Sequence, residues 1–196
     1  MIPFYDRSES ERITLTQSAI AEKRTLFERW IALKDNEASP WSARSAIAAQ
    51  YFADQDGVAD FGCGTMTLEQ HLRPGQFYIP IDVIARDTRT IVCDLNCTPP
   101  PLTAANAAAC LGLLEYLHHP GDFLRILSTH YHVAVISYNP INAHEPSTNR
   151  RAHGWVNDFD MTKLENLFCE SMWVIHDSKR IDSAQMIYKL YSPVSR

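Results

Sequence analysis

A short apolar segment that runs directly into a pair of glycines constrains this chain more than any other feature. The run Gly57–Leu68 reads GVADFGCGTMTL, in which the apolar part ends at Asp60 and the glycines Gly62 and Gly64 stand one residue apart. Glycine has no Cβ, so it allows a sharp turn and lets a ligand lie directly against main-chain atoms. We interpret this run as a strand, a ligand-binding loop and the start of a helix.

Glycine pairs after strands also occur as plain turns, so the loop needs a second signal. Two more apolar strands, Phe77–Val83 and Thr90–Leu95, carry Asp82 and Asp94 near their ends, and Asp82 follows Asp60 by 22 positions. In a βαβ unit, an acid about 20 residues beyond the glycine loop reaches the hydroxyls of a ribose. Three such acids at one sheet edge favour a nucleoside site over a plain turn.

The loop also separates two classes of cofactor. The dinucleotide fingerprint G-x-G-x-x-G needs a glycine at position 67, where this chain has Thr67. A carboxylate at Asp60 would repel a pyrophosphate, whereas it would attract a ligand that carries ammonium and sulfonium charges. The residues therefore favour a cationic nucleoside and disfavour a nucleotide-dependent oxidoreductase.

With these motifs the chain resembles the Rossmann-like (class I) S-adenosylmethionine-dependent methyltransferases over about positions 40 to 190. Asp60–Gly64 matches the family motif of an acid followed by G-x-G, and Ala107–Pro120 is similar to the family's strand followed by LEHL-x-x-P. The resemblance implies a transferase that uses S-adenosyl-L-methionine. Many members have a third glycine where this chain has Met66, which fits the pattern if it already lies at the start of the following helix.

The resemblance also implies which residues bind the cofactor. Asp60 and its loop would hold the methionine end, and Asp82 would accept hydrogen bonds from the ribose hydroxyls. Asp94 and the Leu95 amide would face the adenine. Arg44 is a candidate for the cofactor carboxylate, with an exposed helical arginine as the alternative. The expected cofactor-binding residues are Asp60, Phe61, Gly62, Cys63, Gly64, Asp82, Val83, Asp94, Leu95, Leu113 and Arg44.

The alternation of apolar segments predicts an α/β fold: a Rossmann-like seven-stranded, mostly parallel sheet with one antiparallel strand and helices on both faces. Residues 1–38 are expected to form an N-terminal helical extension or lid, in which Leu26–Leu33 lie on an apolar helical stripe. Residues 39–196 would form the cofactor-binding domain, with a helix over about 39 to 53. Residues 139–154 read as a long polar loop without periodicity. Ligands should lie beyond the carboxyl ends of the parallel strands.

Composition limits the location and the partners. No apolar stretch approaches the ~20 residues of a membrane span, and the N-terminus lacks an apolar signal region, so we expect a cytoplasmic protein with no membrane partner. The net charge is −5 and the longest basic cluster is the pair Arg150–Arg151, which disfavours a nucleic-acid partner. The five cysteines suit reduced thiols, and no metal site is expected. A homodimer or a partner subunit remains open.

Methyl transfer from a positively charged sulfur depends mainly on positioning, and it needs a base only when the acceptor carries a proton. Glu115 and Tyr116 are expected to line the acceptor pocket, and Trp155 and His144 to belong to a loop that closes over it. Each histidine near the strand ends is a candidate base or, alternatively, a surface or capping residue. The candidate bases are His118, His119 and His153.

The sequence therefore predicts a methyltransferase that acts on the oxygen or nitrogen of a small-molecule acceptor. Ser137–Pro140 is a poor match to the N-P-P-Y element of enzymes that methylate exocyclic base nitrogens, so that activity is set aside. The alternative is a catalytically silent methyltransferase-fold module or partner subunit. Binding of S-adenosylhomocysteine without methyl transfer would favour this alternative.

Overall fold

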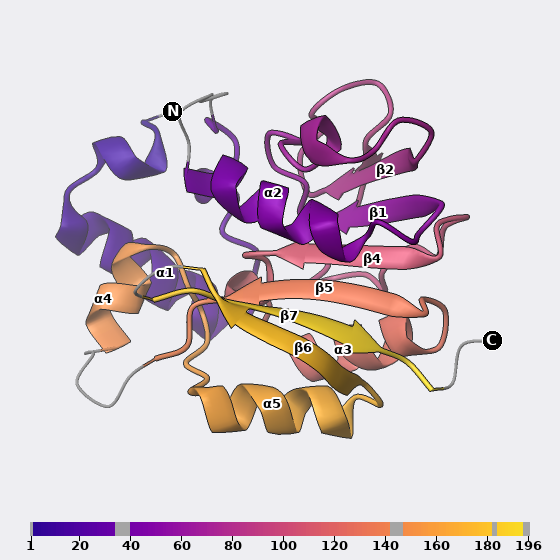
Figure 1. The fold of residues 1–196 in the computed structure, drawn as a ribbon. Coiled ribbons are helices and arrows are strands. Elements are labelled where there is room, and N and C mark those ends of the chain that lie inside the picture. The colour runs from indigo at the N-terminus through magenta and orange to yellow at the C-terminus, as the bar shows by residue number, and fades with distance from the viewer. Residues whose placement is uncertain (1, 34–39, 142–146, 182–183, 194–196) are drawn as a thin grey trace.

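A twisted seven-stranded sheet forms the centre of the computed structural model, which describes residues 2–33, 40–141, 147–181 and 184–193 (Figure 1). The strand order is β3-β2-β1-β4-β5-β7-β6, and only β7 runs against its neighbours. This confirms the predicted mostly parallel sheet with one reversed strand. The strands are β1 (Gly57–Phe61), β2 (Phe77–Asp82), β3 (Ile91–Val92), β4 (Ala107–Leu111), β5 (Val133–Tyr138), β6 (Val174–Arg180) and β7 (Met186–Tyr191).

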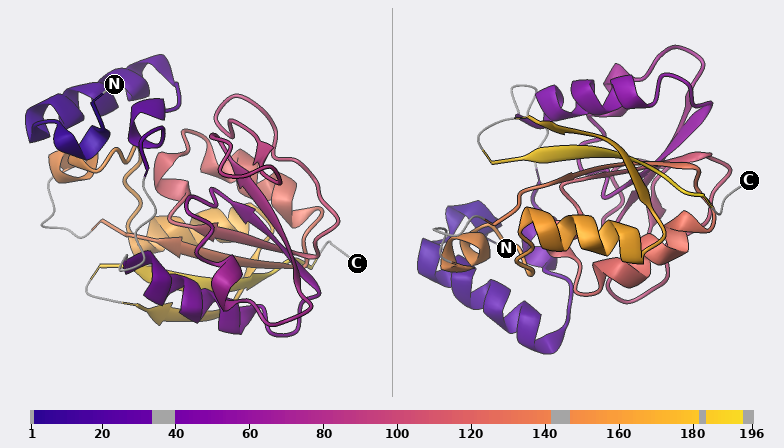
Figure 2. Two further views of the ribbon diagram at one scale, coloured as in Figure 1. Left: turned by 90° about the horizontal axis from the view of Figure 1, so that it is seen from above. Right: turned by 60° about the horizontal axis from the view of Figure 1, so that its bottom comes forward.

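Helices cover both faces of the sheet, as predicted. One face carries α2 (Pro40–Tyr51), and the other carries α3 (Pro120–Ser128) and α5 (Met161–Glu170) (Figure 2). At the end of the sheet where the parallel strands finish, α1 (Glu9–Glu22) lies beside α4 (Ser147–Ala152). The short 3-10 helices are η1 (Phe4–Asp6), η2 (Phe27–Arg29), η3 (Glu69–His71) and η4 (Leu114–Tyr116).

The central strands are buried on both sides and supply two hydrophobic cores. In β4, Ala108 and Cys110 contribute to the core under α3 and α5, while Ala109 and Leu111 contribute to the core under α2. This alternation follows from the two-residue period of a strand, and apolar residues on both faces are typical of a central parallel strand. The nearly continuous apolar sequence of β4 therefore reflects its burial on both faces of the sheet.

The connections between the first four strands differ from the sequence prediction. Residues 62–106 are all described, and apart from β2 and β3 they form turns and η3 but no α-helix. Met66 lies in these turns with a φ of 54°, so the interpretation that it begins a helix is wrong. The connections are short and contain Pro74 and Pro99–Pro101, and proline disrupts a helix interior because it lacks an N–H and its ring clashes with the preceding turn.

Two further expectations also need correction. α1 ends at Glu22, and Lys23 follows in the left-handed conformation with a φ of 52°, so Leu26–Leu33 come after the helix rather than forming a stripe on it. The expected polar loop 139–154 contains α4. Positions 39 and 142–146, which belong to these predictions, lie outside the described residues, as does His144.

No helix in the described part of the chain has both the length and the apolar character needed to cross a membrane. The five cysteines are free thiols. The cytoplasmic location, the domain boundary after residue 38, the absence of a nucleic-acid partner and the possible homodimer are not tested by these findings and remain predictions.

We expect Met66→Gly to be more stable than Met66→Ala by about 1 kcal/mol. A left-handed backbone costs a non-glycine residue ~1–2 kcal/mol, and the greater entropy that glycine loses on folding offsets part of this gain. Both variants lose the same half-buried side chain, so their difference isolates the backbone term. Urea unfolding measures it. An alanine variant as stable as the glycine variant, or more stable, would restore the helical interpretation.

Candidate functional site

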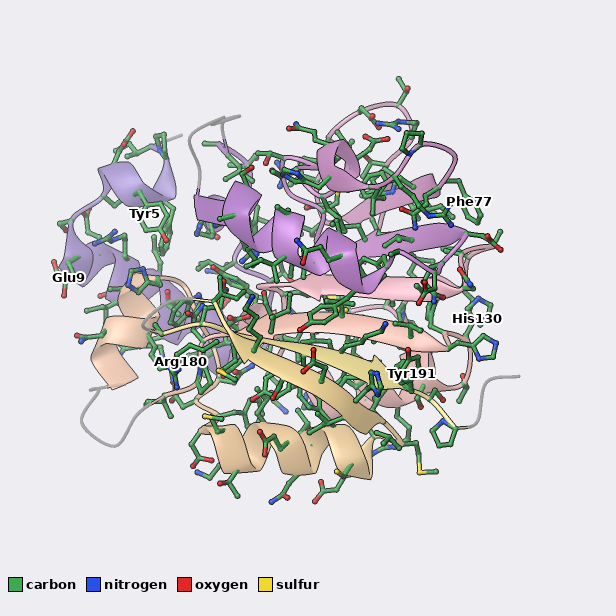
Figure 3. The ribbon with its side chains drawn as sticks, viewed as in Figure 1. Tyr5, Glu9, Phe77, His130, Arg180 and Tyr191 are labelled. Carbon is green, nitrogen blue, oxygen red and sulfur yellow. The ribbon has the colours of Figure 1, made fainter. Side chains whose placement is uncertain are left out.

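Two adjoining cavities open at the carboxyl ends of the parallel strands. The first, here the Asp82 cavity, is narrow and is lined mainly by residues that follow β2, β3 and β4. The second, here the aromatic cavity, has a volume of about 430 Å³. Both are lined by Trp30, Gly62, Gly112 and Tyr116, so they are two parts of one cleft. Tyr5, a further lining residue, lies at this end of the sheet, away from Phe77 and His130 at the other end (Figure 3).

The glycine loop after β1 forms the floor between the two cavities. Gly62 and Gly64 have φ values of 72° and 53°, and the N–H groups of Gly62 and Cys63 both donate to the carbonyl of Ile81, at 2.8 and 3.1 Å. A Cβ on Gly62 would come within 3.0 Å of the Leu113 side chain. The loop therefore needs glycine both for its left-handed backbone and for its close approach to the chain that follows β4.

Asp82 fixes this loop to β2. Its side chain is buried, and one oxygen accepts the N–H of Gly64 at 2.9 Å. The other oxygen accepts the N–H of Ile84 at 2.9 Å and pairs with Arg86 at 3.2 Å. A carboxylate offers about four lone-pair positions, so these three bonds leave room for one more donor in the Asp82 cavity.

Asp60 is the acid of the aromatic cavity. Its side chain is only 3% exposed, and the Tyr78 hydroxyl donates to it at 2.7 Å. Burial raises the pKa of Asp60 to about 7, against the opposing effects of the Tyr78 hydrogen bond and the Arg44 charge. A cationic ligand beside Asp60 would favour its ionised form, because opposite charges attract strongly at a buried site.

The segment after α1 is bonded to the rim of the Asp82 cavity. The Thr25 hydroxyl donates to the Asp94 carboxylate, and the Asn96 amide donates to the Thr25 hydroxyl at 2.9 Å and to the Tyr116 carbonyl at 3.0 Å. The His118 ring nitrogen lies 3.0 Å from the carbonyl of Arg24. This chain segment thereby supplies a wall of the cleft, and His118 helps to hold it there.

Most of the predicted cofactor residues come together in the cleft. Those in the Asp82 cavity are Gly62, Asp82, Val83, Asp94, Leu95 and Leu113. Those in the aromatic cavity are Asp60, Gly62, Cys63, Gly64 and Arg44. Phe61 lies elsewhere, because alternation in β1 points it into the core, where its ring packs against Phe123 and Tyr131. Its backbone still leads into the loop.

The structure does not bring the candidate histidines to the cleft. None of the three lines either cavity. His118 is bonded to the N-terminal segment, His119 is exposed at the start of α3, and His153 is exposed beside the Trp155 ring. Their role as bases is not tested by this placement and remains a prediction.

Glu115 is the buried acid at the base of the aromatic cavity. Its side chain is fully buried in η4, and Oε1 accepts the backbone N–H of Asn139 at 3.0 Å and its amide at 3.3 Å. Oε2 has no partner among the described residues. Burial raises the pKa of Glu115 above its ordinary value, although the bond to Asn139 and the charges of Arg44 and Arg150 act against this. Among the described residues, this carboxyl oxygen is therefore buried without a hydrogen-bond donor.

Sequence reasoning missed several residues that shape this cavity. Arg150 is fully buried and bonds to the carbonyl of Asn139, the Tyr138 hydroxyl and the Asp158 carboxylate, at 2.8, 3.0 and 3.0 Å. Its guanidinium lies 4.6 Å from the Trp155 ring and helps to place that ring in the wall. The aromatic lining residues are Tyr5, Trp30, Trp41, Tyr116 and Trp155. Tyr116 and Trp155 were expected at the pocket, whereas Tyr5, Trp30 and Trp41 come from separate segments, so no local spacing identified these three.

No protein-family model matches the sequence, and none of the curated proteins matches it. Solved structures do match over nearly the whole chain. Human N-acetylserotonin methyltransferase in complex with S-adenosylmethionine is 14% identical, with a TM-score of 0.61, over 95% of this chain and 57% of that chain. This chain thus spans just over half the length of that enzyme.

Two other matching structures hold S-adenosylhomocysteine together with a second small molecule. The Burkholderia thailandensis 1,6-didemethyltoxoflavin-N1-methyltransferase is 16% identical, with a TM-score of 0.61, over 95% of this chain and 91% of that chain. An O-methyltransferase from neocarzinostatin biosynthesis is 13% identical, with a TM-score of 0.62, over 94% and 69% of the two chains. The chain therefore has the Rossmann-like fold of the class I S-adenosylmethionine-dependent methyltransferases, as the sequence motifs predicted.

The stability of the ligand-free protein should contain a component that falls as the pH rises from about 5 to 8. In this range folded Asp60 keeps its proton up to about pH 7, whereas the unfolded chain has already lost it, so the folded state binds more protons. Asp60→Asn should remove this component and should be more stable than the wild type at pH 8. Melting temperatures across this range test it, with exposed Asp54→Asn as the charge-matched control. Parallel profiles for all three proteins would contradict the assignment.

Proposed function

We propose that this chain is an S-adenosylmethionine-dependent methyltransferase that acts on an oxygen or nitrogen of a small aromatic acceptor. The observation that carries the proposal is the continuity of the cleft. A glycine loop and a ribose-type acid line one cavity, and this cavity shares four lining residues with an aromatic cavity that Glu115 also lines. The fold shared with the solved methyltransferases supports the same function.

The donor groups of the cleft fit this cofactor. Asp82 would bind the ribose with its remaining acceptor position, and the chain at Asp94 and Leu95 would meet the adenine. Asp60 suits the cationic methionine end. Arg44 suits its carboxylate, because no ion pair occupies the Arg44 guanidinium among the described residues, and its Nε has no partner. When bound, S-adenosylmethionine supplies a methyl group activated by a positively charged sulfur.

The aromatic cavity supports a flat acceptor. Its aromatic rings offer faces and edges against which another aromatic ring packs favourably. The similar solved structures point the same way, since one holds 1,6-didemethyltoxoflavin and another holds 1,4-dihydroxy-2-naphthoic acid. Methylation on oxygen and on nitrogen are both represented among them.

Glu115 is the group best placed to take the acceptor's proton. As the acceptor oxygen or nitrogen bonds to the methyl group, its proton would pass to Oε2, while Asn139 holds Oε1 in place. A raised pKa makes the ionised carboxylate a stronger base, which suits this role near neutral pH. The geometry supports Glu115 over the three histidines, because Glu115 lines the aromatic cavity and they do not.

Asp82→Ala should weaken the binding of S-adenosylhomocysteine by about 10- to 100-fold, because hydrogen bonds to a charged partner are strong. Titration calorimetry measures this, with circular dichroism to confirm folding, because Asp82 also holds the glycine loop. Asp87→Ala is the matched control, since that acid lies outside both cavities and pairs with Arg89. Wild-type protein that shows neither heat nor a thermal shift at millimolar ligand would refute the cofactor assignment.

Glu115→Gln should lower the rate of methyl transfer by about 100- to 10,000-fold while the affinity for the cofactor is kept. A panel of hydroxylated and aminated aromatic acids with methyl-labelled cofactor supplies the assay. The variants His118→Ala, His119→Ala and His153→Ala should each retain measurable transfer well above that of Glu115→Gln. If only one histidine variant lost methyl transfer, that histidine would be identified as the base in place of Glu115. Cofactor binding without transfer to any acceptor would favour a silent binding module.

A further inference from the structure

Besides Arg44, a second arginine, Arg29, lines the aromatic cavity. Among the described residues, no carboxylate forms an ion pair with it. Arg29, in η2, is 7% exposed and lines the cavity. Its Nε has no partner, and no ion pair to it occurs among the described residues. Its guanidinium lies 4.5 Å from the ring centroids of both Tyr5 and Trp30. Among the residues that the structure describes, the contacts of this buried cation are therefore with two aromatic rings.

Such an arrangement is costly unless something else pairs with the charge. Moving a guanidinium away from water without an anion carries a large desolvation penalty. Contacts with aromatic rings recover only part of this penalty. The planar guanidinium offers paired N–H groups that match a carboxylate, which a lysine would not. Arg29 is therefore suited to pair with a carboxylate that enters the cavity.

The two arginines occupy different parts of the cavity. Arg44 lies against the chain that follows β4, where a Cβ on Gly112 would come within 2.6 Å of its guanidinium. Arg29 belongs to the N-terminal segment, where it is 7% exposed and lies against Tyr5, which is 48% exposed. Glu115 is fully buried. A ligand in this cavity would meet Arg29 from the N-terminal segment and Glu115 from η4.

From this arrangement we infer that the acceptor is an aromatic acid. Its carboxylate pairs with Arg29, its ring lies among the aromatic side chains of the cavity, and its hydroxyl or amino group meets Glu115. The inference rests on the proposed function for the meaning of "acceptor". The carboxylate site itself depends only on Arg29 and its surroundings.

The test compares acids with their neutral amides. Salicylate and 3-hydroxy-2-naphthoate are titrated into protein saturated with S-adenosylhomocysteine, alongside the two matching primary amides. Each acid should bind about 10- to 100-fold more tightly than its amide, as expected for a charge-assisted pair. In Arg29→Met this preference should fall to about threefold or less, while the affinity for S-adenosylhomocysteine stays unchanged.

Two further variants separate charge from packing. Arg125→Met removes the same charge from an exposed position on α3, paired with Asp122, and should keep the full preference. Arg29→Lys keeps the cation and should keep part of the preference. Unfolding curves show whether each variant is folded. If Arg29→Met does not fold, the test passes to Arg29→Lys, whose preference for the acid over the amide should be smaller than that of the wild type but still above equal binding.

Several results would overturn the inference. These are equal binding of acid and amide by the wild type, no binding of either acid, and a preference that survives Arg29→Met. If S-adenosylhomocysteine itself does not bind, the proposed function fails first. The acids and amides are then compared without it, and Arg29 is judged on that preference.

Discussion

The Asp82 carboxylate is the interaction on which the rest of the cleft depends. It receives the Gly64 N–H from the loop after β1 and the Ile84 N–H from its own turn, and it pairs with Arg86. Arg86 in turn donates to the carbonyl of Trp30 at 3.2 Å. One buried acid therefore joins the glycine loop, the second strand and the N-terminal wall. Because each of these bonds is made in a low-dielectric interior, the loss of one leaves an unpaired polar group.

The absence of α-helices between the first four strands gives the N-terminal segment its importance. In residues 62–106 the connections are short, so they cover little of the cleft. The wall is completed by residues that come before α2 and by the region around α4. These two parts are joined, since the Thr16 hydroxyl of α1 donates to the Arg151 carbonyl of α4 at 2.8 Å. Segments more than a hundred residues apart thus form one side of the cleft.

The aromatic cavity is lined by two buried acids and two arginines that form no ion pair with one another among the described residues. Asp60 and Glu115 are buried, and burial raises the pKa of both, to about 7 for Asp60. Arg29 and Arg44 line the same cavity without an ion pair among the described residues. A cavity whose acids and arginines form no ion pairs with one another among the described residues suits a ligand set that itself carries both signs of charge. Clusters of perturbed ionisable groups of this kind are typical of functional sites.

The sequence alone determined the parts of this protein that are local. The alternation of apolar residues fixed the strands, and strand-end acids with the glycine pair fixed the loop and Asp82, because backbone geometry and chain order place such residues at one sheet edge. Glu115 was expected in the pocket, but its free oxygen became visible only with Asn139 folded against it.

Tertiary structure decided the rest. The left-handed Met66, the bonded ring of His118 and the contact of Arg29 with the Tyr5 ring depend on contacts between distant segments. No periodicity or motif encodes such contacts, because burial and charge pairing are properties of the folded neighbourhood and not of the residue itself.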